Sequence, residues 1–238
     1  MIDLAGKRAF VTGGGRGIGR ATALLLERAG ARVVVGYRER KPAPPVVGIG
    51  GDLGDASTAA RVVADVVKSL GALDILVVNH GVWPPDDVAL AKMTDGQWEG
   101  TRRANLDSVV YVCRAAIPHL SQGGTMVLVS STAGQRGEAF HGDYAATKGA
   151  VIALTKALAV ELAPHLTVNC VAPGWVDTEM AAKPYAGGGR KAIEKSIPLG
   201  RVASADDIAG PIVFLCSPLA RHITGEILNV NGGSVLCG

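Results

Sequence analysis

Short aliphatic segments alternate with helix-like segments along nearly the whole chain, and this alternation limits the fold more than any other feature. The aliphatic segments predict β-strands at residues 8–12, 32–37, 45–50, 73–81, 125–131, 166–174 and 226–233. Helical patterns cover residues 18–30, 57–70, 98–120, 143–163 and 204–217. This order predicts one α/β domain over residues 1–238, a doubly wound (Rossmann-type) parallel sheet of about seven strands with helices on both faces.

Composition agrees with this fold, and one connection departs from it. The chain is 48% hydrophobic but only 4% aromatic, so its core is built from small aliphatic side chains, as in sheets covered on both faces. Only "RERKPAPP" (38–45), with three prolines, joins the second and third strands. Because prolines disfavour a helix there, we expect a short extended crossover that leaves part of one sheet face thinly covered.

Charge and cysteine usage argue against several classes of protein. The formal net charge is only +3 and no run of five basic residues occurs, so neither nucleic acid nor a membrane is expected as a partner. No apolar stretch reaches ~18 residues, and the N-terminus lacks a signal-peptide core. Without C-x-x-C or metal-ligand histidine spacing, we expect reduced cysteines, a cytoplasmic location and no metal site.

A glycine-rich loop, "VTGGGRGIGR" (11–20), follows the first predicted strand and opens a helix. Backbone N–H groups and the helix dipole bind phosphate in this context. Neither G-x-G-x-x-G nor the P-loop pattern fits. The spacing is T-G-x-x-x-G-x-G, in which small residues allow a tight turn and close approach of a pyrophosphate.

Further motifs follow in a fixed order along the chain. They are Asp52 after the third strand, "NHG" at 79–81, Asn105, Ser131, Tyr144-x-x-x-Lys148 and "PGWVDT" at 173–178. With the glycine loop, this series resembles the short-chain dehydrogenase/reductase family over nearly the whole chain. "YAATKGAVIALTKALAVELA" and "HITGEILNVNGG" are most similar to 3-oxoacyl-[acyl-carrier-protein] reductases. The resemblance implies an NAD(P)-dependent enzyme that interconverts a ketone and a secondary alcohol.

Four residues form the expected catalytic set: Asn105, Ser131, Tyr144 and Lys148. Residues four apart share a helix face, so we expect the Lys148 ammonium to lower the pKa of the Tyr144 phenol from about 10. Ser131 would donate to the carbonyl oxygen; Ser130 competes for this role, and the family spacing favours Ser131. The resemblance implies that Asn105 holds a water of a proton relay and that Lys148 binds the nicotinamide ribose.

The cofactor preference depends on the end of the second strand. NAD-preferring relatives place an aspartate where this chain has Tyr37, followed by Arg38. Arg16 and Arg38 suit a 2′-phosphate, whereas Glu39 argues for a ribose hydroxyl, and we expect NADP(H) over NAD(H). Asp52 would bind the adenine edge, and Val176 and Thr178 the carboxamide and phosphate. The expected cofactor-binding residues are Gly13, Gly15, Arg16, Gly17, Ile18, Gly19, Tyr37, Arg38, Asp52, Leu53, Asn79, Gly81, Tyr144, Lys148, Pro173, Gly174, Val176 and Thr178.

Two histidines lie beside these motifs. His80 replaces the family's usual small residue, and we interpret it as a hydrogen-bonded structural imidazole. His141 either lines the substrate entrance or is simply exposed. The 83–93 loop and a lid at 179–200, with glycines at 187–189, would shape the pocket.

The substrate expected first is a 3-oxoacyl thioester. Acyl carrier proteins are acidic, and only Arg136, Lys183, Arg190 and Lys191 offer basic charge near the site. The alternatives are a general carbonyl reductase or alcohol dehydrogenase that uses NAD(H) on a small ketone, sugar or cyclic alcohol, and a non-catalytic cofactor-binding sensor. The helix over 144–163 is apolar on more than one face, which with the resemblance predicts a homotetramer.

Overall fold

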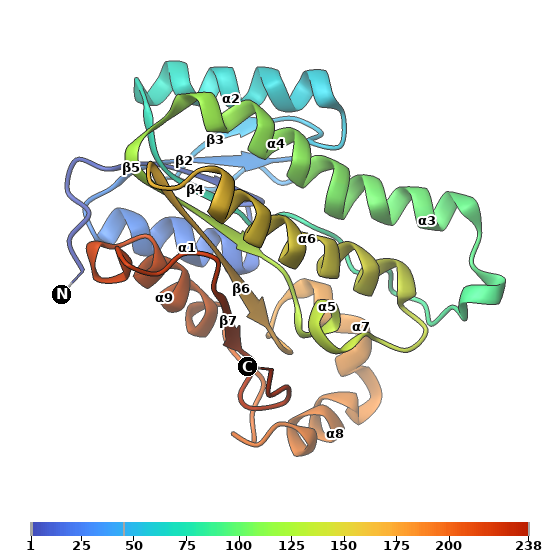
Figure 1. Cartoon of the computed structure of the whole chain (residues 1–238). Coiled ribbons are helices and arrows are strands. Elements are labelled where there is room, and N and C mark those ends of the chain that lie inside the picture. Colours follow the sequence, from blue (N-terminus) through green and yellow to red (C-terminus); the bar gives the residue numbers. More distant parts are fainter. Residues whose placement is uncertain (1, 45, 238) are drawn as a thin grey trace.

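The computed structural model describes residues 2–44 and 46–237. Its centre is one seven-stranded parallel sheet in the order β3-β2-β1-β4-β5-β6-β7, with helices on both faces (Figure 1). The strands are β1 (Arg8–Thr12), β2 (Arg32–Tyr37), β3 (Val47–Gly50), β4 (Leu73–Val78), β5 (Leu120–Val129), β6 (Leu166–Pro173) and β7 (Ile227–Val230). The predicted doubly wound parallel sheet is confirmed.

The longer helices form two layers around this sheet. One layer contains α1 (Gly17–Arg28) and α9 (Ala205–Leu215), which pack side by side. The other contains α2 (Ala56–Leu70), α4 (Ser108–Ala116) and α6 (Gly142–Glu161). The remaining helices are α3 (Asp95–Arg102), α5 (Thr132–Arg136), α7 (Ala182–Tyr185) and α8 (Gly189–Ser196). Short turns of 3₁₀ or π type are η1 (Leu90–Lys92), η2 (Arg103–Asp107), η3 (Ile117–His119), η4 (Glu179–Ala181), η5 (Ala186–Gly188) and η6 (Pro218–Ala220).

The aliphatic strands are buried on both faces because successive side chains point to opposite sides of the sheet. On the side of α2, α4 and α6, Phe10 of β1 and Leu76 of β4 belong to one apolar cluster. Their neighbours Val11 and Val77 belong to the cluster on the side of α1 and α9. Continuous aliphatic runs therefore predicted these strands correctly.

The connection between β2 and β3 is as short as predicted. Its described residues, 38–44 and 46, contain no helix, although β2 and β3 pair in parallel. Pro45, the first residue of the predicted third strand, lies outside the described residues. Two rings pack directly on β3, since a Cβ on Gly48 would lie 2.6 Å from Cγ of Pro42 and one on Gly50 would lie 3.1 Å from Cζ of Tyr37. The proline-containing loop and Tyr37 therefore cover β3, where a crossover helix would otherwise pack.

Two boundaries differ from the sequence prediction in ways that matter for the site. The helix expected over 98–120 is divided into α3, the π-helical turn η2 that contains Asn105, and α4, and it ends in the turn η3 at Pro118. The fifth strand, expected to end at Ser131, ends at Val129. Ser131 instead caps α5, a short helix that its polar, glycine-containing sequence did not reveal.

All four cysteines are free; Cys113, Cys170 and Cys216 are buried, and Cys237 is exposed. A separate finding concerns helix length: over residues 2–44 and 46–237, none of the helices combines the length and apolar character needed to cross a bilayer.

Candidate active site

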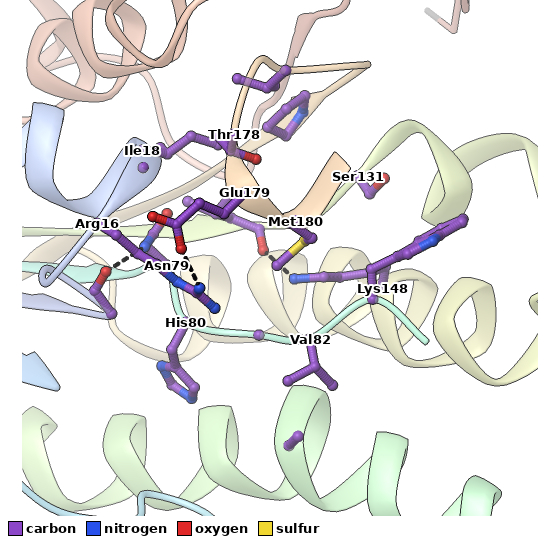
Figure 2. Close-up of a pocket in the computed structure, with 18 of the residues that line it drawn as sticks. Arg16, Ile18, Asn79, His80, Val82, Ser131, Lys148, Thr178, Glu179 and Met180 are labelled. Atoms are coloured by element: carbon purple, nitrogen blue, oxygen red, sulfur yellow. Dashed lines mark hydrogen bonds and ion pairs between the residues drawn. The ribbon is translucent and has the colours of Figure 1, made fainter. Parts of the chain in front are cut away.

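A cavity of about 670 Å³ opens at the carboxyl ends of the central strands. In open parallel sheets ligands bind at this edge, where the strand order reverses on either side of β1. Figure 2 shows side chains from the glycine loop, the β4 loop, α6 and the segment after β6 around it. All of the predicted site residues line the cavity except Gly19 and Asn105, which lie directly behind its wall.

The glycine loop leaves no room for side chains. A Cβ on Gly19 would lie 2.4 Å from the carbonyl oxygen of Gly13, and one on Gly15 would lie 2.3 Å from that of Arg40. The loop leads into α1, whose first N–H groups have no intrahelical partner. Bare backbone beside the positive end of a helix fits the pyrophosphate of a dinucleotide. These residues therefore fit NAD(P).

Hydrogen bonds from the β4 loop hold this edge of the sheet together. Asn79 donates from its backbone N–H to Oγ1 of Thr12 (3.0 Å) and from Nδ2 to the Thr12 carbonyl (3.1 Å). His80 places Nδ1 2.7 Å from Thr12 Oγ1 and Nε2 2.8 Å from Ser108 Oγ. Burial lowers the pKa of His80 to about 3, because a charged imidazole would lose its hydration. The expected hydrogen-bonded imidazole at His80 is confirmed, since both ring nitrogens have a hydroxyl partner.

Tyr144 and Lys148 lie one turn apart on α6, with Lys148 Nζ 5.8 Å from the Tyr144 ring centroid. Nζ donates to the carbonyl of Val129 at the end of β5 (2.9 Å), and burial lowers the pKa of Lys148 to about 8. The expected lowering of the tyrosine pKa is wrong for the protein alone. Burial raises the pKa of Tyr144 to about 12 and outweighs the hydrogen bond from Ser131, because the phenolate is desolvated. At neutral pH the phenol therefore carries a proton that it can donate.

The two neighbouring serines have different partners. Ser130 donates from its hydroxyl to the backbone carbonyl of Lys148 (2.7 Å) and is buried. Ser131, as the N-cap of α5, accepts from the N–H of Ala133 (3.2 Å) and interacts with the Tyr144 phenol. The geometry favours Ser131 as the group that would meet a carbonyl oxygen beside Tyr144.

Asn105 is completely buried in the π-helical turn and does not face solvent. Its Oδ1 accepts from the N–H of Val82 (2.7 Å) and its Nδ2 donates to the Val82 carbonyl (2.9 Å). A Cβ on Gly81 would lie 3.0 Å from Asn105 Oδ1 and 3.3 Å from Lys148 Nζ. Asn105 and Lys148 therefore both lie close to Gly81, and Gly81 and Lys148 line the cavity whereas Asn105 does not.

Aromatic residues beside Tyr144 are functional candidates that the sequence reasoning missed. The Trp83 ring packs edge-on against Tyr144 (4.6 Å between centroids) and lies 6.2 Å from Trp175. Trp83 follows the motif "NHG" by two residues and Trp175 lies inside "PGWVDT", and these positions were the available signal. His141 is buried and stacks on Trp83 at 4.0 Å. Among the described residues that line the cavity, His141 is absent. His141 is therefore neither exposed nor part of the cavity lining, and both expectations for it are wrong.

Charged side chains at the adenine end of the cavity are paired with one another. Asp52, expected at the adenine edge, lies 2.7 Å from Nη2 of Arg103. Arg38, expected at the 2′-phosphate, pairs with the adjacent Glu39 (2.6 Å). The sequence reasoning also missed an ion pair between Arg40, from the short crossover, and Glu179, from the segment after β6. No cluster of three potential metal ligands exists among the described residues.

Comparison with known proteins agrees with this geometry. The family described as "Enoyl-(Acyl carrier protein) reductase" matches residues 13–234. The 3-oxoacyl-[acyl-carrier-protein] reductase FabG of Vibrio harveyi is 36% identical, with 98% of each chain covered. A short-chain dehydrogenase/reductase (glucose/ribitol dehydrogenase) from Brucella melitensis superposes with a TM-score of 0.93 at 34% identity, covering 99% of each chain.

A further structural relative carries a cofactor. It is a short-chain dehydrogenase from Burkholderia cenocepacia in complex with NADP, with a TM-score of 0.88, 34% identity, and 97% of this chain and 98% of that chain covered. The relatives point to the same family as the fold, the glycine loop and the tyrosine–lysine pair. The chain belongs to the short-chain dehydrogenase/reductase family and is an NAD(P)-dependent oxidoreductase.

Proposed function

We propose that this enzyme uses NADP(H) to interconvert a ketone and a secondary alcohol. The observation that carries the proposal is a protonated tyrosine, Tyr144, held between Ser131 and Lys148 at the carboxyl edge of the sheet. When bound, NADP(H) supplies the hydride for reduction and accepts it in the reverse direction. The cavity offers room for this cofactor along the glycine loop and for a substrate beside Trp83.

The chain's own groups handle the proton. In the reduction direction, Tyr144 Oη donates its proton to the substrate's carbonyl oxygen, and the Ser131 hydroxyl donates a hydrogen bond to the same oxygen. The Lys148 ammonium, facing the ring, stabilises the phenolate that remains. Asn105 lies next to Lys148 across Gly81, a position suited to a water that returns a proton to the site.

Two observations support NADP(H) over NAD(H). The adenine end of the cavity carries the guanidinium groups of Arg16, Arg38 and Arg40, and the last residue of β2 is Tyr37 rather than an acidic residue. A relative of 34% identity was solved with NADP. Calorimetric titration of NADPH and NADH tests the preference, and tighter binding of NADH would contradict it.

A 3-oxoacyl thioester is the substrate class that the curated relatives support, because several of them are 3-oxoacyl-[acyl-carrier-protein] reductases. Docking of an acidic carrier protein requires available positive charge at the cavity mouth. Three of the four basic residues expected to provide it are engaged: Arg136 with Glu138, Lys183 with Asp86, and Arg190 with Asp177. This arrangement weakens the case for a carrier-bound substrate.

The aromatic cluster favours a second candidate, a compact cyclic or aryl ketone. The chain has only three tryptophans and four tyrosines, yet Trp83, Trp175, Tyr144 and Tyr185 lie together at the substrate end. Flat rings stack well on planar substrates and offer a flexible acyl chain no specific recognition.

Substitution of Trp83 distinguishes the two candidates. For a ring ketone, Trp83→Leu is expected to lower kcat/KM by about two- to tenfold, because stacking contributes about 0.5–1.5 kcal/mol beyond area burial. Turnover of a 3-oxoacyl thioester should change much less. NADPH oxidation with both substrate series measures this, and equal losses would leave the thioester as the better candidate.

The reductase mechanism itself depends on the Tyr144 phenol. Tyr144→Phe keeps the ring that packs on Trp83 but removes the proton donor, so ketone reduction should fall by about 10²–10⁴-fold. Binding of NADPH, measured by calorimetry, should be retained. Undiminished turnover would refute the mechanism, while loss of turnover with intact cofactor binding would exclude the sensor alternative.

A further inference from the structure

The Glu179 carboxylate lies between two guanidinium groups from distant parts of the chain. Oε2 is 2.7 Å from Nη1 of Arg16 in the glycine loop, and Oε1 pairs with Nη1 of Arg40 in the short crossover after β2. All three residues line the cavity, and Figure 2 shows Glu179 paired with Arg16 there. We call this group the charge clamp (Arg16, Arg40 and Glu179).

The two arginines of the clamp come from the glycine loop and from the segment after β2. In doubly wound folds a dinucleotide's adenosine ribose meets the end of the second strand beside the glycine loop. The crossover backbone passes directly over that loop, because a Cβ on Gly15 would lie 2.3 Å from the Arg40 carbonyl oxygen. Two guanidinium groups that converge on two oxygens of one anion are also a suitable receptor for a phosphate monoester.

The neighbouring arginine, Arg38, is engaged elsewhere. Both Nε and Nη2 of Arg38 donate to Oε1 of Glu39, at 3.0 and 2.6 Å. This local pair satisfies the Arg38 guanidinium with an adjacent residue, whereas Arg40 reaches across the cavity to a different segment. Arg40 is therefore the better partner for Arg16 in binding an anion.

We propose that Arg16 and Arg40 form the 2′-phosphate site and that Glu179 occupies it in the cofactor-free protein, an inference that rests on the proposed NADP(H) function. The phosphate displaces the Glu179 carboxylate and takes both guanidinium groups. Glu179 thus acts as an internal competitor that the cofactor must replace.

Exposure makes this exchange feasible. The side chains of Arg16, Arg40 and Glu179 are 58%, 63% and 56% exposed, and ion pairs in such surroundings contribute little to stability. A phosphate monoester carries nearly two negative charges near neutral pH and offers three acceptor oxygens, against one charge for a carboxylate.

Displacement also changes the lid. Glu179 begins the turn η4, the first element of the segment 179–200, and residues 179–181 line the cavity. Two further ion pairs tether this segment, Lys183 with Asp86 and Arg190 with Asp177. Binding of a 2′-phosphate therefore releases the tether nearest the cofactor and leaves the other two in place.

Nucleotide fragments test the site without any turnover. Adenosine 2′,5′-bisphosphate carries the 2′-phosphate and 5′-AMP lacks it, and calorimetric titration gives both affinities. Glu179→Gln should tighten the bisphosphate by about three- to tenfold, since a competing ion pair of modest strength is removed. Arg40→Met should weaken it by about tenfold or more, the loss expected for a charge-assisted hydrogen bond. Binding of 5′-AMP should change by less than about twofold in both variants.

Two matched controls isolate the clamp. Glu138→Gln removes another carboxylate from the cavity lining, one that pairs with Arg136 rather than with the clamp. Arg38→Met removes the adjacent guanidinium. Glu138→Gln should leave the ratio of the two nucleotide affinities unchanged, and Arg38→Met should reduce it less than Arg40→Met does.

Three results would overturn the inference: unchanged bisphosphate affinity in Arg40→Met, a larger loss in Arg38→Met, or weaker bisphosphate binding in Glu179→Gln. If the wild type binds the two nucleotides equally, both the clamp and the NADP(H) preference fail. Ketone reduction with NADH would then still support the reductase proposal, so the two failures are distinguishable.

Discussion

At the scale of single residues, burial decides the protonation states of the site. Burial raises the pKa of Tyr144 and lowers the pKa values of Lys148 and His80. In each case the neutral form is favoured, because the charged form would lose its hydration. For Tyr144 this keeps the proton on the phenol, the form required for ketone reduction. Sequence spacing placed Tyr144 beside Lys148 correctly but gave the wrong direction for its pKa, since spacing carries no information on desolvation.

His80 should make folding stability depend on pH in the acid range. Its pKa is about 3 in the folded protein and about 6.5 when unfolded, so the unfolded chain binds the proton first as pH falls. The stability that His80 contributes is complete above pH 6.5 and is lost as pH falls towards 3. His80→Ala should cost about 1–3 kcal/mol at pH 7, from lost hydrogen bonds and a small cavity.

Urea unfolding at pH 7 and at pH 4.5 measures this effect. The stability gap between wild type and His80→Ala should shrink at the lower pH. The exposed His222→Ala serves as the control and should show no such trend. A gap independent of pH would contradict the assignment of a neutral structural imidazole.

At the scale of elements, the glycine loop depends on contacts that forbid a side chain. Gly19→Ala would place its Cβ 2.4 Å from the Gly13 carbonyl oxygen and 2.5 Å from Asn79 Nδ2, within the βα turn. We expect a destabilisation of about 1–3 kcal/mol and weaker cofactor binding. In α3, a Cβ on Gly100 meets no atom within 4 Å, and Gly100→Ala should stabilise the fold by about 0.5–1 kcal/mol. Thermal unfolding compares the two, and equal effects would refute the packing argument.

Elements also show where sequence reasoning reached its limit. Aliphatic runs predicted the strands because a sheet covered on both faces requires such runs. The end of β5 was misplaced because Ser130 and Ser131 suit a strand end and a helix cap equally. Ser131, Tyr144 and Asn105 came from ordered motifs, whereas Arg40, Glu179 and Trp83 make contacts between distant segments that no local pattern encodes.

At the scale of the whole molecule, exposed apolar side chains on the α4–α6 face support the predicted oligomer. Val160 on α6 is 81% exposed and Val110 on α4 is 37% exposed. A homotetramer that buries this face stays a prediction, as does the folding of residues 1–238 as one domain.

Sedimentation velocity tests the oligomer. The wild type should sediment as a tetramer, and Val160→Glu should shift it to a smaller species because a charge cannot be buried between apolar helices. Leu90→Glu, at a residue 74% exposed on η1, is the matched control and should leave the assembly unchanged. A monomeric wild type would refute the prediction.

The short crossover between β2 and β3 has a consequence for how this enzyme can diverge. Arg38, Glu39 and Arg40 are exposed and lie on a segment without helix, so exchanging them alters no apolar contact of the sheet. Surface substitutions of this kind change stability by only about 0.5 kcal/mol. Substitutions in this segment can therefore change the cofactor preference of the enzyme without a prior increase in the stability of the fold.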